Sequence, residues 1–221
     1  MTSKLKKEIA RMNELIAKLK EWKSLEQAEV EATLKELEKI PRNEWSKFKV
    51  DALSDPKLAR ALVSVGNTFS ENWKILRNAV STLHSLISRY ELTATHEIHE
   101  FLLRHRGNKK VAYYIALVLP YLPQFENNVE QWEYIMKIPT FAPHDKSADI
   151  FYGLIWKRAG EIPEERQEEI IGYFRNLLSN ESLGEYRKKK CRELLARIDE
   201  ARPAPSPTTR PASRSGSRIL A

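Results

Sequence analysis

Cysteine and glycine are scarce in this 221-residue sequence, and each scarcity excludes a class of fold. The single cysteine, Cys191, excludes an intramolecular disulfide framework and a zinc site built from several thiolates. One free thiol also fits a reducing compartment better than secretion. Seven glycines are few for a fold of strands and tight hairpins, so a helical chain is favoured.

Long apolar runs are missing as well. The first twenty residues contain no continuous apolar stretch of the kind that a secretory signal needs. The most apolar segment, residues 111–122, is interrupted by Pro120 and is too short to span a bilayer. We therefore expect a cytoplasmic protein without a membrane partner.

Positive charge is unevenly spread along the chain. Of the seven net charges, four are arginines within residues 202–221, which leaves +3 for the preceding 201 residues. A folded part with so little net charge gives only weak support for a nucleic-acid surface. Residues 202–221 contain four prolines and only two large apolar side chains, so we expect a disordered basic tail there.

The rest of the chain has a helical period. Five apolar residues spaced by 4, 3, 4 and 3 positions predict a first helix: Leu5, Ile9, Met12, Ile16 and Leu19. Ser24 and Gln27 predict a capping box for a second helix, which ends before Pro41. We expect these helices to form an antiparallel hairpin. A dimeric coiled coil is the alternative, although about two heptads are short for one.

Start and stop signals divide the remaining helices. Asp55 and Pro56 predict a capped helix start, Ser70 predicts the cap of a helix over 71–90, and Gly107 predicts a left-handed C-terminal cap. Further helices are expected over 109–122, 128–138, 146–160, 164–179 and 182–200. We expect three parts: an N-terminal hairpin with a short helix (1–54), a helical-repeat core (55–201) and the tail (202–221).

The helix pairs have a nearly constant period. Their first helices are expected to begin near 71, 109, 146 and 182, at intervals of 38, 37 and 36 residues. The segment NWKILRNAVSTL, residues 72–83, resembles a HEAT-repeat helix, in which apolar-Arg-x-x-Ala-x-x-x-Leu patterns recur, although Ala79 stands one residue early. The resemblance implies an all-α fold of antiparallel helix pairs stacked as a short HEAT-like α-solenoid. An irregular helical bundle is the alternative.

The segment HEIHE, residues 96–100, is similar in composition to the HExxH motif of zinc proteases, but its histidines are three residues apart instead of four. At about 100° per residue, His96 and Glu100 point outward and His99 lies on the flank of the helix. A catalytic zinc ion normally needs three protein ligands in a shielded cavity. We therefore expect no metal and no cofactor. The inward face is predicted to consist of four residues: Ile98, Phe101, Leu102 and His105. We expect His105 to bond a backbone carbonyl.

No other catalytic pattern is present in the sequence. It has no glycine-rich phosphate loop and no Gly-x-Ser-x-Gly elbow. Cys191 is spaced from Leu194 and Ile198 like a small core residue. A non-enzymatic protein is favoured, and a hydrolase or glycosylase with unrecognised carboxylate chemistry is an alternative.

Three basic segments are candidate contacts for nucleic acid or an acidic partner: Lys47 and Lys49; Arg104, Arg106, Lys109 and Lys110; and Arg187, Lys188, Lys189 and Lys190. Some HEAT-like proteins that handle damaged DNA bind its backbone through a concave basic surface, so the resemblance implies such contacts. The five tryptophans mostly occupy positions of the apolar helical period, so we expect them to be core residues rather than platforms on which bases stack.

The sequence thus favours a helical-repeat scaffold module that binds a macromolecular partner, a protein in the first place. The alternative is a nucleic-acid-binding helical protein, such as a subunit of a ribonucleoprotein complex. The oligomeric state is not predicted.

Overall fold

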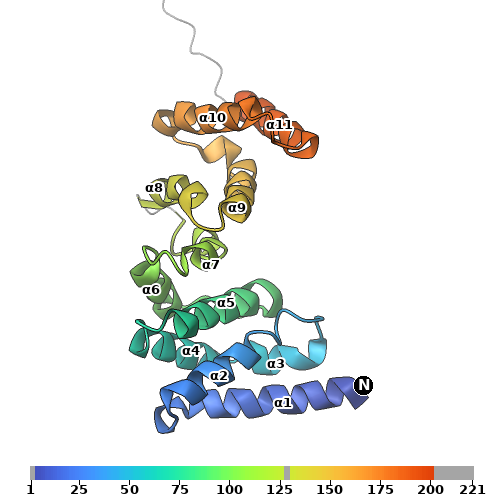
Figure 1. Cartoon of the computed structure of the whole chain (residues 1–221), viewed down its shortest axis with the longest axis vertical. Coiled ribbons are helices and arrows are strands. Elements are labelled where there is room, and N and C mark those ends of the chain that lie inside the picture. Colours follow the sequence, from blue (N-terminus) through green and yellow to red (C-terminus); the bar gives the residue numbers. More distant parts are fainter. Residues whose placement is uncertain (1–2, 127–129, 202–221) are drawn as a thin grey trace, which may run out of the picture. The chain divides into compact units, whose positions relative to one another are not determined.

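The computed structural model describes residues 3–126 and 130–201, and this part of the chain consists of α-helices joined by loops and short 3-10 turns, with no strand (Figure 1). The all-α prediction is confirmed. No helix in the described part is both long and apolar enough to cross a membrane. The expected tail lies outside the described residues. The helices are α1 (Ser3–Lys20), α2 (Gln27–Leu37), α3 (Val50–Leu53), α4 (Pro56–Thr68), α5 (Trp73–Tyr90), α6 (His96–His105), α7 (Ala112–Ala116), α8 (Glu130–Lys137), α9 (His144–Lys157), α10 (Glu164–Ser179) and α11 (Glu185–Ala201).

The chain divides into two compact units, Met1–Leu154 and Ile155–Ala221. In the first unit α1 packs against α2 and α4, and α5 packs against α2, α4 and α7 (Figure 1). Helix α6 packs against α4 and α7. The contact between α1 and α2 agrees with the expected hairpin. The core of this unit is formed by leucine and other aliphatic side chains with no exposed surface, among them Leu19, Leu34, Leu62 and Leu83.

The second unit is a helix pair in which α10 packs against α11, and α11 also contacts the 3-10 turn Ala159–Glu161. The buried side chains of the two helices are Ile170, Ile171, Phe174, Cys191, Leu194 and Ile198. The burial of Cys191 confirms its place as a small core residue. Arg197 ties α11 to the end of α9, because its Nε donates to the backbone oxygen of Trp156 at 2.9 Å.

The cap of α4 is the predicted one, whereas the cap of α5 is not. Asp55 accepts a hydrogen bond from the backbone N–H of Lys57 at 2.8 Å, and Pro56 begins the helix. Helix α5 is capped by Asn72 instead of Ser70, and the Asn72 Oδ1 accepts from the backbone N–H of Lys74 at 3.1 Å. Asparagine caps a helix about as well as serine does, so α5 can begin at Asn72, two residues later than predicted.

Two further helix ends also differ from the prediction. The capping box of α2 consists of Glu26 and Glu29, not of Ser24 and Gln27. Helix α6 does not end in a left-handed glycine, since no described glycine has a positive φ. The left-handed residue is instead Glu91 (φ 59°), at the end of α5.

The apolar segment expected as one helix over 109–122 is shorter and broken. Helix α7 covers only Ala112–Ala116, and the 3-10 turn Leu119–Tyr121 follows with Pro120 inside it. Proline has no N–H and its ring clashes with the preceding helical turn, which explains the break. The helices expected to open successive pairs start at 73, 112, 144 and 185, a less regular spacing than predicted. A HEAT-like solenoid stays a prediction.

Candidate functional site

The turn between α2 and α3 presents two exposed aromatic side chains on a fixed backbone. Trp45 is 53% exposed and Phe48 is 52% exposed. The indole Nε1 of Trp45 donates to the backbone oxygen of Arg89 at 3.1 Å. The Arg89 guanidinium in turn donates to the backbone oxygens of Pro41 at 2.8 Å and Asn43 at 2.9 Å. We call residues 45–48 the aromatic turn, which these bonds attach to the end of α5.

The first basic segment overlaps the aromatic turn, and its two lysines, Lys47 and Lys49, differ in exposure. Lys47 is exposed, and its Nζ lies 5.4 Å from the centre of the Phe48 ring. Lys49 is only 1% exposed. Its Nζ donates to Glu8 Oε1 at 2.8 Å and to the backbone oxygen of Glu44 at 3.1 Å. Lys49 therefore holds α1 against the loop, and a partner would meet Lys47.

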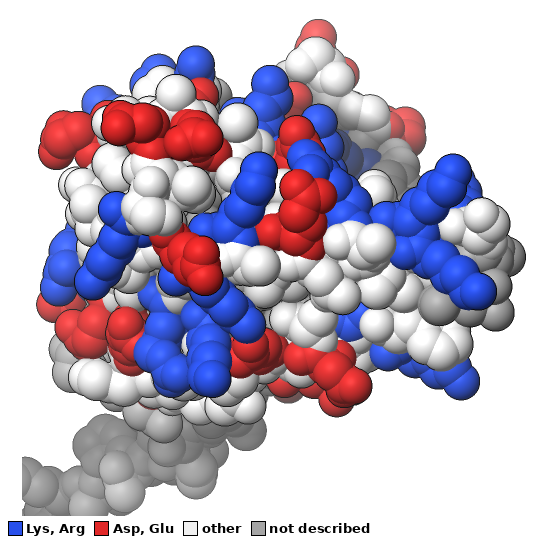
Figure 2. All heavy atoms as spheres, turned by 90° about the horizontal axis from the view of Figure 1, so that it is seen from below, with Lys and Arg blue, Asp and Glu red and all other residues white. Residues whose placement is uncertain are grey.

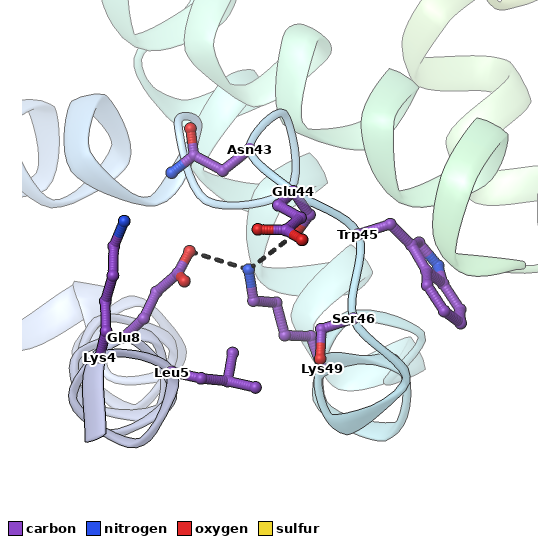
Figure 3. Close-up of a pocket in the computed structure, with 8 residues that line it drawn as sticks. All are labelled: Lys4, Leu5, Glu8, Asn43, Glu44, Trp45, Ser46 and Lys49. Carbon is purple, nitrogen blue, oxygen red and sulfur yellow. Dashed lines mark hydrogen bonds and ion pairs between the residues drawn. The ribbon is translucent and has the colours of Figure 1, made fainter. Parts of the chain in front are cut away.

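A cavity of about 590 Å³ adjoins the aromatic turn (Figure 3). Figure 3 shows the ammonium group of Lys49 between the carboxylate of Glu8, which comes from α1, and the loop that carries Glu44. The lining combines charged groups with the side chains of Leu5 and Trp45. The full set is Lys4, Leu5, Glu8, Asn43, Glu44, Trp45, Ser46 and Lys49.

The second basic segment lies between α6 and α7, and several of its cations bind within the protein. Arg104 donates to Asn67 Oδ1 at 3.1 Å, and Arg106 forms an ion pair with Glu130 at 2.5 Å. Lys109 is exposed and lines a cavity of about 310 Å³. The sequence alone does not indicate these internal partners, because they come from distant helices.

Trp73 lies beside this second segment with a cation near its ring from each of two elements. The guanidinium carbon of Arg77 is 5.3 Å and the Lys110 Nζ is 5.7 Å from the ring centre. Trp73 is 39% exposed, although its helical position predicted burial. None of the five tryptophans is buried, so the expectation that most of them form the core is wrong. Long amphipathic side chains often cover the edge of a core in this way.

The third basic segment lies on α11 in the second unit. Lys188 pairs with Glu185 at 3.3 Å and Lys189 pairs with Glu193 at 3.8 Å. Arg187 is half-buried, and the Lys190 Nζ lies 4.8 Å from the centre of the exposed Tyr186 ring. These short-range ion pairs are ordinary on a helix surface and need no partner to explain them.

One of the three histidines of α6, His99, differs from its predicted position. His96 and Glu100 are exposed as expected, whereas His99, expected on the flank, is buried. One ligand atom from each of these three residues lies within 4.8 Å of the others, a separation that would suit a metal ion. His105 is buried as predicted, but its Nε2 lies 3.3 Å from the side-chain oxygen of Asn67 instead of a backbone carbonyl.

Burial shifts the ionisation of several of these groups. It lowers the pKa of His99 and of His105, and the positive charge of Arg104 lowers the His105 pKa further. Burial raises the pKa of the Cys191 thiol, which leaves it a poor nucleophile.

Charge on the face drawn in Figure 2 is mixed. Basic and acidic side chains are interspersed there, and no continuous basic area covers this face of the described residues. No family model matches the chain, and the comparisons with curated proteins and with solved structures found no match. The contacts given above therefore stand as the basis for a functional assignment.

Proposed function

We propose that this chain is a non-enzymatic, cytoplasmic helical-repeat module that binds another protein through the aromatic turn. The single observation that carries the proposal is the exposure of Trp45 and Phe48, three residues apart, on a backbone attached to α5 and α1. Tryptophan and other aromatic side chains dominate the binding energy of protein interfaces, where they fill pockets on the partner.

The attachment of the turn strengthens this interpretation. Ordering a loop on binding reduces affinity, so a loop that is already ordered gives a partner more net binding energy. Here Trp45 is fixed through Arg89, and Lys49 is fixed through Glu8. The Trp45 indole and the backbone that carries Phe48 are thus held in place before a partner binds.

The charges nearby favour a particular partner. Lys47 lies beside the Phe48 ring, and Lys4 lines the adjacent cavity, while the carboxylate of Glu8 is already paired with Lys49. A protein segment with apolar side chains for the two rings and a carboxylate for Lys47 would complement this surface.

The proposal is tested by affinity retention from cell extract with the full chain, compared with Phe48→Ala and with Tyr186→Ala. Tyr186 is a matched control, because it is also an exposed aromatic ring in contact with a lysine. A hot-spot aromatic contributes about 2 kcal/mol or more, so Phe48→Ala should weaken binding of the retained protein about 30-fold. Calorimetry with that protein, purified, measures the ratio directly.

Tyr186→Ala should leave the affinity unchanged. If Phe48→Ala and Tyr186→Ala bind every retained protein as the wild type does, the aromatic turn is not the interface. Circular dichroism of each variant checks that its helices are intact.

Nucleic-acid binding is the second candidate, and Trp73 is the observation that favours it. An exposed ring with Arg77 and Lys110 beside it resembles a stacking platform flanked by phosphate contacts. With these two phosphate contacts to a single strand, affinity should fall about sevenfold between about 50 and 200 mM salt. Fluorescence anisotropy with labelled single-stranded DNA and RNA measures this, and absence of binding at the lower salt concentration excludes the candidate.

A further inference from the structure

His99 is buried on α6 without any hydrogen bond to either ring nitrogen. Its exposed fraction is 5%, and both Nδ1 and Nε2 are shielded from solvent with no hydrogen-bonding partner. Buried polar groups are nearly always hydrogen-bonded, since an unsatisfied one is costly. The ring of Phe125 lies beside His99, with 6.2 Å between the ring centres, and an apolar ring cannot supply the missing hydrogen bond. Both ring nitrogens of His99 therefore lack a polar partner among the described residues.

Two further ligand groups lie close to the Nδ1 side of the His99 ring. The Nδ1 of His99 is 3.7 Å from Glu100 Oε1, and the Nε2 of His96 is 3.9 Å from the same oxygen. His96 and Glu100 are both exposed, so solvent can deliver an ion to this position. The three residues have the spacing i, i+3 and i+4, which places them side by side on one helix.

We propose that His96, His99 and Glu100 form a binding site for a divalent transition-metal ion, with Zn²⁺ as the ion that its chemistry fits best. Two imidazole nitrogens and one carboxylate oxygen are typical zinc ligands, and a water molecule would complete a tetrahedron. Calcium and magnesium ions prefer sites composed of oxygen atoms alone, so they fit this set poorly.

The distances agree with such a site. Ligand atoms that bind zinc at about 2.0–2.1 Å in a tetrahedron are separated from one another by about 3.4 Å. The two separations of 3.7 and 3.9 Å exceed this by a few tenths of an ångström, and the ligand nitrogens of His96 and His99 lie within 4.8 Å of each other. Rotation of the exposed His96 and Glu100 side chains can supply that adjustment, whereas His99 stays fixed by its burial.

Electrostatics act in both directions. Burial lowers the pKa of His99, so its imidazole is neutral at neutral pH, as a metal ligand must be. His96 opens α6, and the positive end of the helix dipole there opposes a cation. The carboxylates of Glu97, in the first turn, and Glu100 offset that field.

The site differs from that of a zinc protease in the role of its glutamate. In the protease motif the glutamate is a base beside two histidines four residues apart. Here the glutamate occupies the position of the second histidine and serves as a ligand. The proposal therefore concerns metal binding and does not assign a hydrolytic reaction.

The test is titration of the full chain, freed of affinity tag and of metal, with Zn²⁺ by calorimetry and with Co²⁺ by visible absorption. We expect one ion per chain and a Co²⁺ spectrum of tetrahedral type. His96→Ala and Glu100→Ala should each weaken Zn²⁺ binding by more than about tenfold, since loss of even an outer-shell partner typically weakens it 10–100-fold. Both residues are exposed, so neither substitution should disturb folding.

His144→Ala is the matched control, because His144 is an exposed histidine at the start of another helix, α9. Its affinity for Zn²⁺ should equal that of the wild type. Absence of Zn²⁺ binding would overturn the proposal, and so would binding that His96→Ala and Glu100→Ala leave unchanged. A loss of affinity in His144→Ala equal to that in the other variants would also overturn it, because it would indicate scattered surface binding.

Discussion

Gly66 on α4 lies against the Phe101 ring of α6, and alanine at this position should destabilise the protein. A Cβ atom on Gly66 would lie 2.6 Å from Cζ and 2.7 Å from Cε2 of Phe101, a buried ring on α6. Carbon atoms do not approach this closely, so either the ring or the helix must move. Helices α4 and α6 are in contact along this region.

Two effects of opposite sign decide the magnitude. Alanine is favoured over glycine inside a helix by about 1 kcal/mol. Overpacking a core costs about 1–3 kcal/mol. We therefore expect Gly66→Ala to lower the free energy of unfolding by about 1 kcal/mol. With a urea m-value of about 2 kcal/mol/M, the midpoint of unfolding should fall by about 0.5 M.

A second substitution reverses the sign. Phe101→Leu removes the Cζ and Cε2 atoms that the new methyl group would meet, at a cost below the roughly 3–5 kcal/mol of Phe→Ala. In the Phe101→Leu background, Gly66→Ala should raise the free energy of unfolding by up to about 1 kcal/mol, because only the helix preference remains. Urea unfolding of the four proteins, followed by circular dichroism, measures the coupling. Equal effects of Gly66→Ala in both backgrounds would refute the steric explanation.

Three other results are expected. Glu8→Ala leaves the buried Lys49 ammonium with only the Glu44 carbonyl, so it should lower the free energy of unfolding by about 2 kcal/mol, measured by urea unfolding at pH 7. Lys49→Met should lower it by less, because that substitution removes the buried charge as well. Asp55→Ala removes the cap of α4 and should cost about 1 kcal/mol. The hydrogen bond from Lys20 lowers the pKa of Asp55, so the stabilisation by Asp55 is complete above its ordinary value of 3.8 and should disappear as the pH falls through the lower folded value. A constant difference between wild type and Asp55→Ala from pH 7 to pH 2 would contradict this linkage. Burial lowers the pKa of His84 below its ordinary 6.5, so the unfolded chain binds more protons than the folded one. The free energy of unfolding should therefore rise with pH up to about 6.5 and then level off. His84→Gln should show a smaller rise in the same denaturation series, and an unchanged slope would exclude His84 as a cause.

Helix bounds and buried faces were predicted best where a single local signal in the sequence allowed few alternatives. Asp55 and Pro56 together allow few alternatives to a helix start, and α4 begins there. The helix expected over 164–179 is α10 with the same bounds, because Pro163 precedes it and acidic residues fill its first turn. The inward face of α6 also follows from its period, and Ile98, Phe101 and Leu102 are buried.

The burial of Lys49 and His99 and the position of Trp45 could not be predicted, because they depend on contacts between segments that are distant in the sequence. Nothing in the local sequence indicates that Lys49 is buried, since its partner Glu8 is 41 residues away. At about 100° per residue, His99 lies about 60° from Leu102, the nearest residue of the predicted inward face. Its ring is in contact with Phe125, a residue far away in the sequence that the helical period of α6 does not indicate. The Trp45 indole is likewise held by a bond to the backbone oxygen of Arg89 in another helix, 44 residues away. The aromatic turn and the proposed metal site therefore became visible only in the folded chain.

The left-handed residue at the end of α5 has a consequence for protein engineering. Glu91 adopts φ 59°, a conformation that a residue with a Cβ atom adopts only with strain, and its N–H bonds back to Leu86. Glycine would adopt this conformation without that penalty. Glu91→Gly should therefore raise the free energy of unfolding. A more stable variant of this kind would be a suitable starting protein for crystallisation or for a mutational scan of the aromatic turn.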